Sequence, residues 1–151
     1  MEQKEIQDIT RQYFKQLGFQ VLKKTRFYFE SDELVLRLWL QRSQFSETYY
    51  FTYDIRIKAL HPEIKDLTNE NVWDTTVGGR LGYDSHKGFH VEYPLWDQQT
   101  YLKDLKKLTE KQLVPIMKQG VAYVKKLALN PKSCGAWIVF KEDDRQKILT
   151  L

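Results

Sequence analysis

The feature that most constrains the fold is an apolar residue at every second position in two runs, residues 34–40 and 49–57. The alternating apolar residues are Leu34, Leu36, Leu38, Leu40, Tyr49, Phe51, Tyr53, Ile55 and Ile57. Successive side chains of a β-strand point to opposite faces, so this period of two predicts strands with one buried face. Because antiparallel sheets commonly bury one face and leave the other toward solvent, an antiparallel meander is the expected arrangement.

A further strand is predicted just before this region, where the same alternation runs through residues 24–29. The polar tetrapeptide ESDE (residues 30–33) is expected to turn the chain between the two strands. A turn of four residues would place Phe29 opposite Leu34 on the core face.

The second part of the sheet is predicted from shorter signals. Residues 80–92 favour a hairpin in which Arg80 faces Glu92, a pair of opposite charges that stabilises a sheet. The glycines of GGRLG (residues 78–82) indicate a β-bulge or a close backbone contact. The apolar run AWIVF (residues 136–140) predicts a last, buried strand.

Helical spacing appears at both ends of the chain. Residues 2–17 predict an amphipathic helix that stops at Gly18, and residues 97–129 predict a long helical segment capped by Asp97. Pro115 lies inside that segment and predicts a kink or a break into two helices. The expected fold class is α+β, with an antiparallel sheet of about five or six strands. One face of that sheet would be packed by the N-terminal helix and the long, Pro-interrupted C-terminal helical segment.

Length and composition narrow the class of protein. At 151 residues the chain has the size of one domain, expected to span residues 1–151. The lone Cys134 excludes an internal disulfide, the first ten residues do not resemble a signal peptide, and the longest apolar runs are too short to span a bilayer. We therefore expect a cytoplasmic protein that engages no membrane.

Chemical motifs give no indication of catalysis. The sequence contains no phosphate-binding glycine loop, no G-x-S-x-G elbow and no paired C-x-x-C, so no cofactor is expected. Cys134 has no base beside it in the sequence and fits a small buried residue better than a nucleophile.

The first candidate site is the face of the sheet that does not form the core. Its predicted binding residues are Lys24, Arg26, Arg37, Trp39 and Tyr50. Trp, Tyr and Arg are enriched among the residues that anchor protein partners, and exposed aromatics beside guanidinium groups also stack nucleobases. The expected register puts Arg26 opposite Arg37, and an acidic partner would relieve the repulsion between them. A face covered by the C-terminal helix, with these groups serving only the fold, is the competing explanation.

The second candidate is a basic stripe on the C-terminal helical segment, which carries seven lysines against three acidic residues between Asp97 and Ala128. The stripe consists of Lys103, Lys107, Lys111, Lys118 and Lys125. At about 100° per residue these five lysines share one arc of a continuous helix and could follow a phosphate backbone. Lysines on the wet face of an amphipathic helix are more often simply solvated.

The third candidate combines imidazole and carboxylate groups near the predicted hairpin. Asp84, His86, His90 and Glu92 could hold a divalent cation or relay a proton. The alternative is that these are ordinary loop residues and that Glu92 is paired with Arg80.

Several phrases of the sequence, in order, also carry a resemblance. They are LGFQVLKKTRFYFE, VLRLWLQRSQFSETYYFTYDIRI, RLGY and LTEKQLVPIMKQG. Together they resemble an uncharacterised bacterial and phage family of domains of unknown function, the 4304-type, over roughly residues 6–130. The resemblance implies the fold described above and no particular chemistry.

These observations favour a non-catalytic binding module that engages a protein through the outer sheet face, and the basic groups there would suit an acidic partner. By analogy of architecture and lineage, a toxin-neutralising immunity protein or a phage counter-defence protein would suit it. The alternatives left open are a single-stranded nucleic-acid binder using the same face and a metal-dependent hydrolase at the third candidate site.

Overall fold

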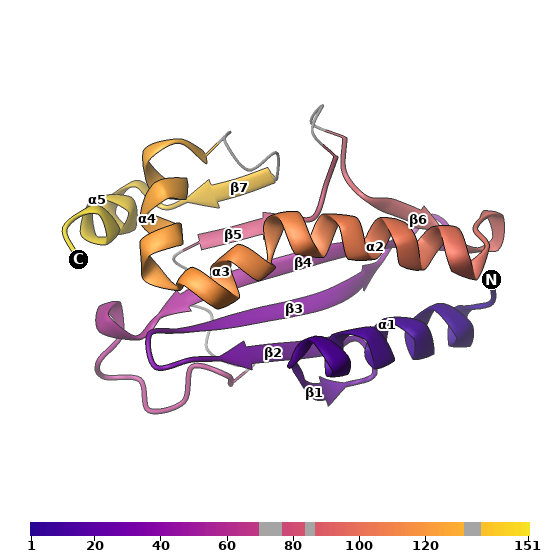
Figure 1. Cartoon of the computed structure of the whole chain (residues 1–151), viewed down its shortest axis with the longest axis horizontal. Coiled ribbons are helices and arrows are strands. Elements are labelled where there is room, and N and C mark those ends of the chain that lie inside the picture. Colours follow the sequence, from indigo (N-terminus) through magenta and orange to yellow (C-terminus); the bar gives the residue numbers. More distant parts are fainter. Residues whose placement is uncertain (70–76, 84–86, 132–136) are drawn as a thin grey trace.

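The fold is α+β, as expected, and is built on one seven-stranded antiparallel sheet. The computed structural model describes residues 1–69, 77–83, 87–131 and 137–151. The strands are β1 (Gln20–Lys23), β2 (Arg26–Glu30), β3 (Leu34–Arg42), β4 (Thr48–Ile57), β5 (Val77–Arg80), β6 (His90–Glu92) and β7 (Trp137–Phe140). Their order across the sheet is β1-β2-β3-β4-β5-β7, and β6 pairs with β4 beyond the end of β5 (Figure 1).

Helices cover one face of this sheet (Figure 1). They are α1 (Gln3–Leu17), α2 (Gln98–Gln112), α3 (Val114–Gln119), α4 (Val121–Leu129) and α5 (Glu142–Leu149), with short 3₁₀ turns η1 (Lys58–Leu60) and η2 (Tyr93–Leu95). No helix among the described residues has the length and apolar character needed to cross a bilayer.

The alternating residues of β3 and β4 form the core, as the sequence predicts. All nine have at most 4% of their surface exposed and belong to the main apolar cluster with residues of the helices. Two buried hydrogen bonds fix α1 against α2, since the hydroxyls of Thr10 and Tyr101 lie 2.6 Å apart, as do those of Tyr13 and Thr109. Burial raises the pKa of Tyr101, which keeps this hydroxyl protonated as a partner for Thr10.

The helix ends follow the sequence signals. Gly18 ends α1 at φ 109°, where its amide donates to the Lys15 carbonyl at 3.1 Å. Asp97 caps α2 by accepting from the Thr100 amide at 2.9 Å. Pro115 breaks the helical segment as expected, but the result is three helices rather than two, because Gly120 separates α3 from α4 as well.

The register between β2 and β3 differs from the expected one by two residues. Phe29 pairs with Leu36 rather than with Leu34, so only Asp32 and Glu33 lie between the last facing positions, Ser31 and Leu34. A shift of two leaves every side chain on its predicted face, since the period of a strand is two.

Three further expectations about the sheet are wrong. Arg80 pairs with Thr52 rather than with Glu92, which faces Thr48, because β5 and β6 both pair with β4. Gly78 and Gly79 lie in regular pairing with β4 and β7 and form no bulge, although the alternative expectation, a close backbone contact, holds at Gly82, where a Cβ would lie 2.8 Å from the Lys87 carbonyl oxygen. The last strand, observed over residues 137–140, lies at the edge of the sheet beside β5. It is not buried as expected, and Val139 is 71% exposed.

Gly120 is the position where the helical layer depends most on glycine. Its φ of 61° and ψ of −136° are adopted almost only by glycine, and a Cβ there would lie 2.2 Å from Oε1 of Glu33. We expect Gly120→Ala to lower the free energy of unfolding by about 1–3 kcal/mol, measured by urea denaturation. Gln119→Ala, at the exposed neighbouring position, is the control and should change it by less than about 0.5 kcal/mol. Equal losses in the two variants would contradict the conclusion that the backbone at residue 120 requires glycine.

Candidate functional site

The outer face of the sheet, opposite the helices, presents its side chains in rows across the strands. In the central row, Arg26 of β2 faces Trp39 of β3, which faces Thr52 of β4, which faces Arg80 of β5. A neighbouring row contains Gln41, Tyr50 and His90. The row on the other side contains Tyr28, Arg37, Asp54 and Gly78.

One half of this face is closed. Val35, Asp54 and Arg56 have at most 2% of their surface exposed although they point away from the helices. The segment 61–69 lies against this part of the face through the Leu67 and Asn69 carbonyls, which contact Arg56, and Leu67 is itself 4% exposed. We call this region, formed by Val35, Arg37, Asp54 and Arg56, the closed half.

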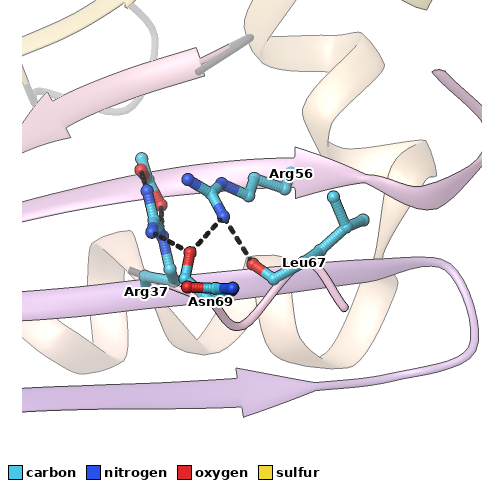
Figure 2. Close-up of polar contacts among 5 residues, drawn as sticks. Arg37, Arg56, Leu67 and Asn69 are labelled. Carbon is cyan, nitrogen blue, oxygen red and sulfur yellow. Dashed lines mark hydrogen bonds and ion pairs between the residues drawn. The ribbon is translucent and has the colours of Figure 1, made fainter. Parts of the chain in front are cut away.

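Two guanidinium groups hold the closed half together (Figure 2). Arg56 donates from Nη1 to the carbonyls of Leu67 at 2.7 Å and Asn69 at 3.0 Å. Arg37 donates from Nη1 to the same Asn69 carbonyl at 3.2 Å. Arg37 also makes a two-pronged ion pair with Asp54, in which Nε lies 2.8 Å from Oδ1 and Nη2 contacts Oδ2.

The covering segment has its own local restraint. The hydroxyl and amide of Thr68 donate to Oδ1 of Asp66 at 2.5 and 2.9 Å, forming a turn. The Thr68 hydroxyl, followed by its amide, holds the pKa of the Asp66 carboxyl below its usual value, so the turn carries an ionised acceptor at neutral pH.

The other half of the outer face is open and contains a hollow of about 410 Å³. We call the region formed by Trp39, Gln41, Tyr50, Thr52 and Arg80 the open half. The lining residues of the hollow are Trp39, Thr52, Tyr53, Asp54, Gly78, Gly79, Arg80 and Val139. The hollow exists because Gly78, which faces Asp54 on one side and Val139 on the other, has no side chain on this face.

Arg80 is held in a defined position at the edge of the hollow. Its guanidinium carbon lies 5.1 Å from the centre of the Tyr50 ring, a cation–π contact. Its Nη2 donates to Oε1 of Gln41 at 3.5 Å, and the Thr52 hydroxyl donates to the same oxygen at 3.2 Å. The ring of His90 meets Tyr50 edge-on at 4.7 Å. The contacts with Tyr50 and Gln41 thus orient the Arg80 guanidinium at the edge of the hollow.

The five predicted binding residues occupy different parts of this face. Trp39 lines the hollow, and Tyr50 supports Arg80. Arg37 belongs to the closed half. Arg26 faces Trp39 and not Arg37, while Lys24 lies in the β1–β2 turn and not beside Trp39. Arg26 and Arg37 are therefore not directly opposite each other. Asp54 also neutralises Arg37, so the expected repulsion does not arise.

The basic stripe is not a single line. Three of its lysines, Lys103, Lys107 and Lys111, are exposed on α2, while Lys118 is on α3 and Lys125 on α4. Lys125 donates to the Leu151 carbonyl. Figure 1 shows α4 running across the direction of α2, so the common arc expected of one continuous helix is lost.

The third candidate site is only partly described. His90 and Glu92 are exposed on the outer face two residues apart on β6, as predicted, whereas Asp84 and His86 lie outside the described residues. Among residues 1–69, 77–83, 87–131 and 137–151, no three His, Cys, Asp or Glu side chains come together to hold a metal ion. Cys134 also lies outside the described residues.

Sequence reasoning missed Arg80, Gly78 and Val139 as parts of the site. The available signal was the Gly78-Gly79 pair inside a strand, where side chains that normally pack a sheet are missing. Assigning the hollow to the outer face required the pairing of β5 with β7, which has no local sequence signal.

Comparison with known proteins identifies the family and nothing more specific. A family model described as a domain of unknown function, DUF4304, matches residues 10–119. The chain belongs to this family. The matched DUF4304 region contains the whole closed half and every open-half residue named above, while Val139 lies beyond it. No curated protein and no solved structure matches the chain.

The closed half predicts a stability difference between two ion pairs. Asp54 is almost completely buried beside Arg37, whereas the Glu30–Lys58 pair, at 2.8 Å, is 46% and 36% exposed. We expect Asp54→Ala to lower the free energy of unfolding by about 3–5 kcal/mol, because it leaves a largely buried cation without its counter-ion. Glu30→Ala should cost less than about 1 kcal/mol. Urea denaturation of both variants checks this, and similar losses would contradict the division of the face.

Proposed function

We propose that this DUF4304 protein is a non-catalytic binding module that docks a partner protein on the open half of its outer sheet face. The observation that carries the proposal is the hollow beside Trp39, with Arg80 held over Tyr50 at its edge. Tryptophan, tyrosine and arginine are the side chains most enriched among binding hot spots, which lie in pockets that exclude water.

Rigidity supports the same conclusion. Trp39 and Arg80 belong to paired strands, and Gln41 links Arg80 to Thr52 of β4, so little ordering is left to occur on binding. A preorganised surface loses less conformational entropy when a partner docks. An inhibitory role, such as covering the active surface of a toxin or of a defence protein, suits a module of this kind and is an analogy from architecture.

Nucleic-acid binding receives less support. The lysines of the basic stripe belong to the helical layer, which covers the opposite face of the sheet from Trp39. A strand bound on the open half would therefore not reach the α2 lysines, and the basic groups would not act together.

Capture from host lysate tests the proposal. The immobilised protein should retain a specific protein after nuclease treatment, and Trp39→Ala should reduce that retention by about thirtyfold, as expected for a hot spot of about 2 kcal/mol. Phe45→Ala is the matched control, because Phe45 is an aromatic residue 95% exposed on the β3–β4 connection. Retention that nuclease abolishes, or that the two variants reduce equally, would contradict the proposal.

A further inference from the structure

We propose that the open half binds an extended segment of partner chain in which a large apolar side chain and a carboxylate are two residues apart. The hollow takes the apolar side chain, and Arg80 takes the carboxylate. This inference rests on the proposed function and specifies the chemistry of the partner.

The hollow accepts an apolar group. Trp39 and Val139 lie on opposite sides of it, and the backbone of Gly78 and Gly79 contributes to its lining. Val139 is 71% exposed, so covering it removes apolar surface from water. The volume of the hollow, about 410 Å³, lies within the range of roughly 300–1,000 Å³ that is typical of ligand pockets in proteins.

Arg80 is suited to a carboxylate. Arginine presents five N–H donors in a planar fork that matches the two oxygens of a carboxylate. Arg80 contacts Tyr50 and, through one Nη2 donor, Gln41, which leaves its other donors for a ligand. In the described part of the central row the ionisable side chains are Arg80 and, three strands away on β2, Arg26, so the charge of this row favours an anion.

The acidic residues of the outer face leave this preference intact. Asp54 is neutralised by Arg37, and Glu92 lies beyond His90 on β6, facing Thr48. A carboxylate that binds Arg80 therefore lies on the central row, whose described ionisable side chains, Arg80 and Arg26, are cations.

The spacing of the two subsites matches an extended chain. Gly78 and Arg80 are two residues apart on β5 and point to the same face, which separates them by about 6.6–6.8 Å. Side chains i and i+2 of an extended partner segment have the same separation and also point the same way. A segment lying along β5 thus places its apolar side chain over Gly78 and its carboxylate at Arg80.

Peptide display provides the first test. A phage library of random dodecapeptides is selected on the immobilised full chain and counter-selected on Gly78→Val, which fills the hollow. Gly78 is not among the positive-φ glycines of the described chain, Gly18 and Gly120, so its backbone conformation does not oppose a valine. We expect enrichment of a large apolar residue two positions from Asp or Glu, in either order. Enrichment without an acid at that spacing, or no enrichment at all, would overturn the inference.

A double-mutant cycle on the best peptide supplies the second test. Fluorescence polarisation should show at least about tenfold weaker binding for Arg80→Gln and for the peptide with its acid changed to the amide. Combining the two changes should cost little more than either alone, which assigns the carboxylate to Arg80 even if Gly78→Val fails to fold. Lys118→Gln, an equal change of charge on α3, should leave the affinity within twofold.

The outcomes separate this inference from the proposed function. If Trp39→Ala abolishes capture of the lysate protein but the peptide acid and Arg80 contribute independently, the partner chemistry is wrong and the binding module stands. If a fluorescent dT12 oligonucleotide binds tightly and loses affinity in Arg80→Gln and Gly78→Val, the face recognises nucleic acid and both proposals fail.

Discussion

The buried guanidinium of Arg56 is the interaction on which the arrangement of the outer face depends. A cation with none of its surface exposed is costly unless hydrogen-bond acceptors replace water around it. The carbonyls of Leu67 and Asn69 serve this purpose, so the segment 61–69 must lie over the sheet for Arg56 to be solvated by the protein. The ion pair of Arg37 with Asp54 borders the same acceptors and extends the closed half by one row.

This closure determines where a partner can dock. Because the closed half is covered, the face that remains accessible is the part beyond Asp54, where Trp39, Thr52 and Arg80 share a row. Gly78 then matters more than any side chain, since its missing Cβ turns a flat sheet surface into a hollow between Trp39 and Val139. The polar contacts of Arg80 complete a surface with one apolar and one cationic subsite.

The fold was largely predictable from sequence, and the site only in part, for one physical reason. Alternation assigns each side chain to a face, and Leu36 and Tyr53 are in the core as expected. It does not determine which residues face each other, because a two-residue shift preserves every face. The shift between β2 and β3 placed Arg26 opposite Trp39 instead of Arg37, and the separate register between β3 and β4 places Arg37 opposite Asp54. Arg56 is buried by a polar segment that forms no strand pair with β4. Such a contact leaves no periodic pattern in the sequence, so the closed half could not be predicted.

Hydroxyl-radical footprinting of the full chain, read residue by residue by mass spectrometry, tests the division of the outer face most directly. After correction for intrinsic reactivity, Trp39 and Val139 should be modified much faster than Leu67, which the closed half buries. Modification of Leu67 at the rate of Val139 would mean that the segment 61–69 does not cover the sheet. Protection of Trp39 to the level of Leu67 would mean that the open half is not accessible to a partner.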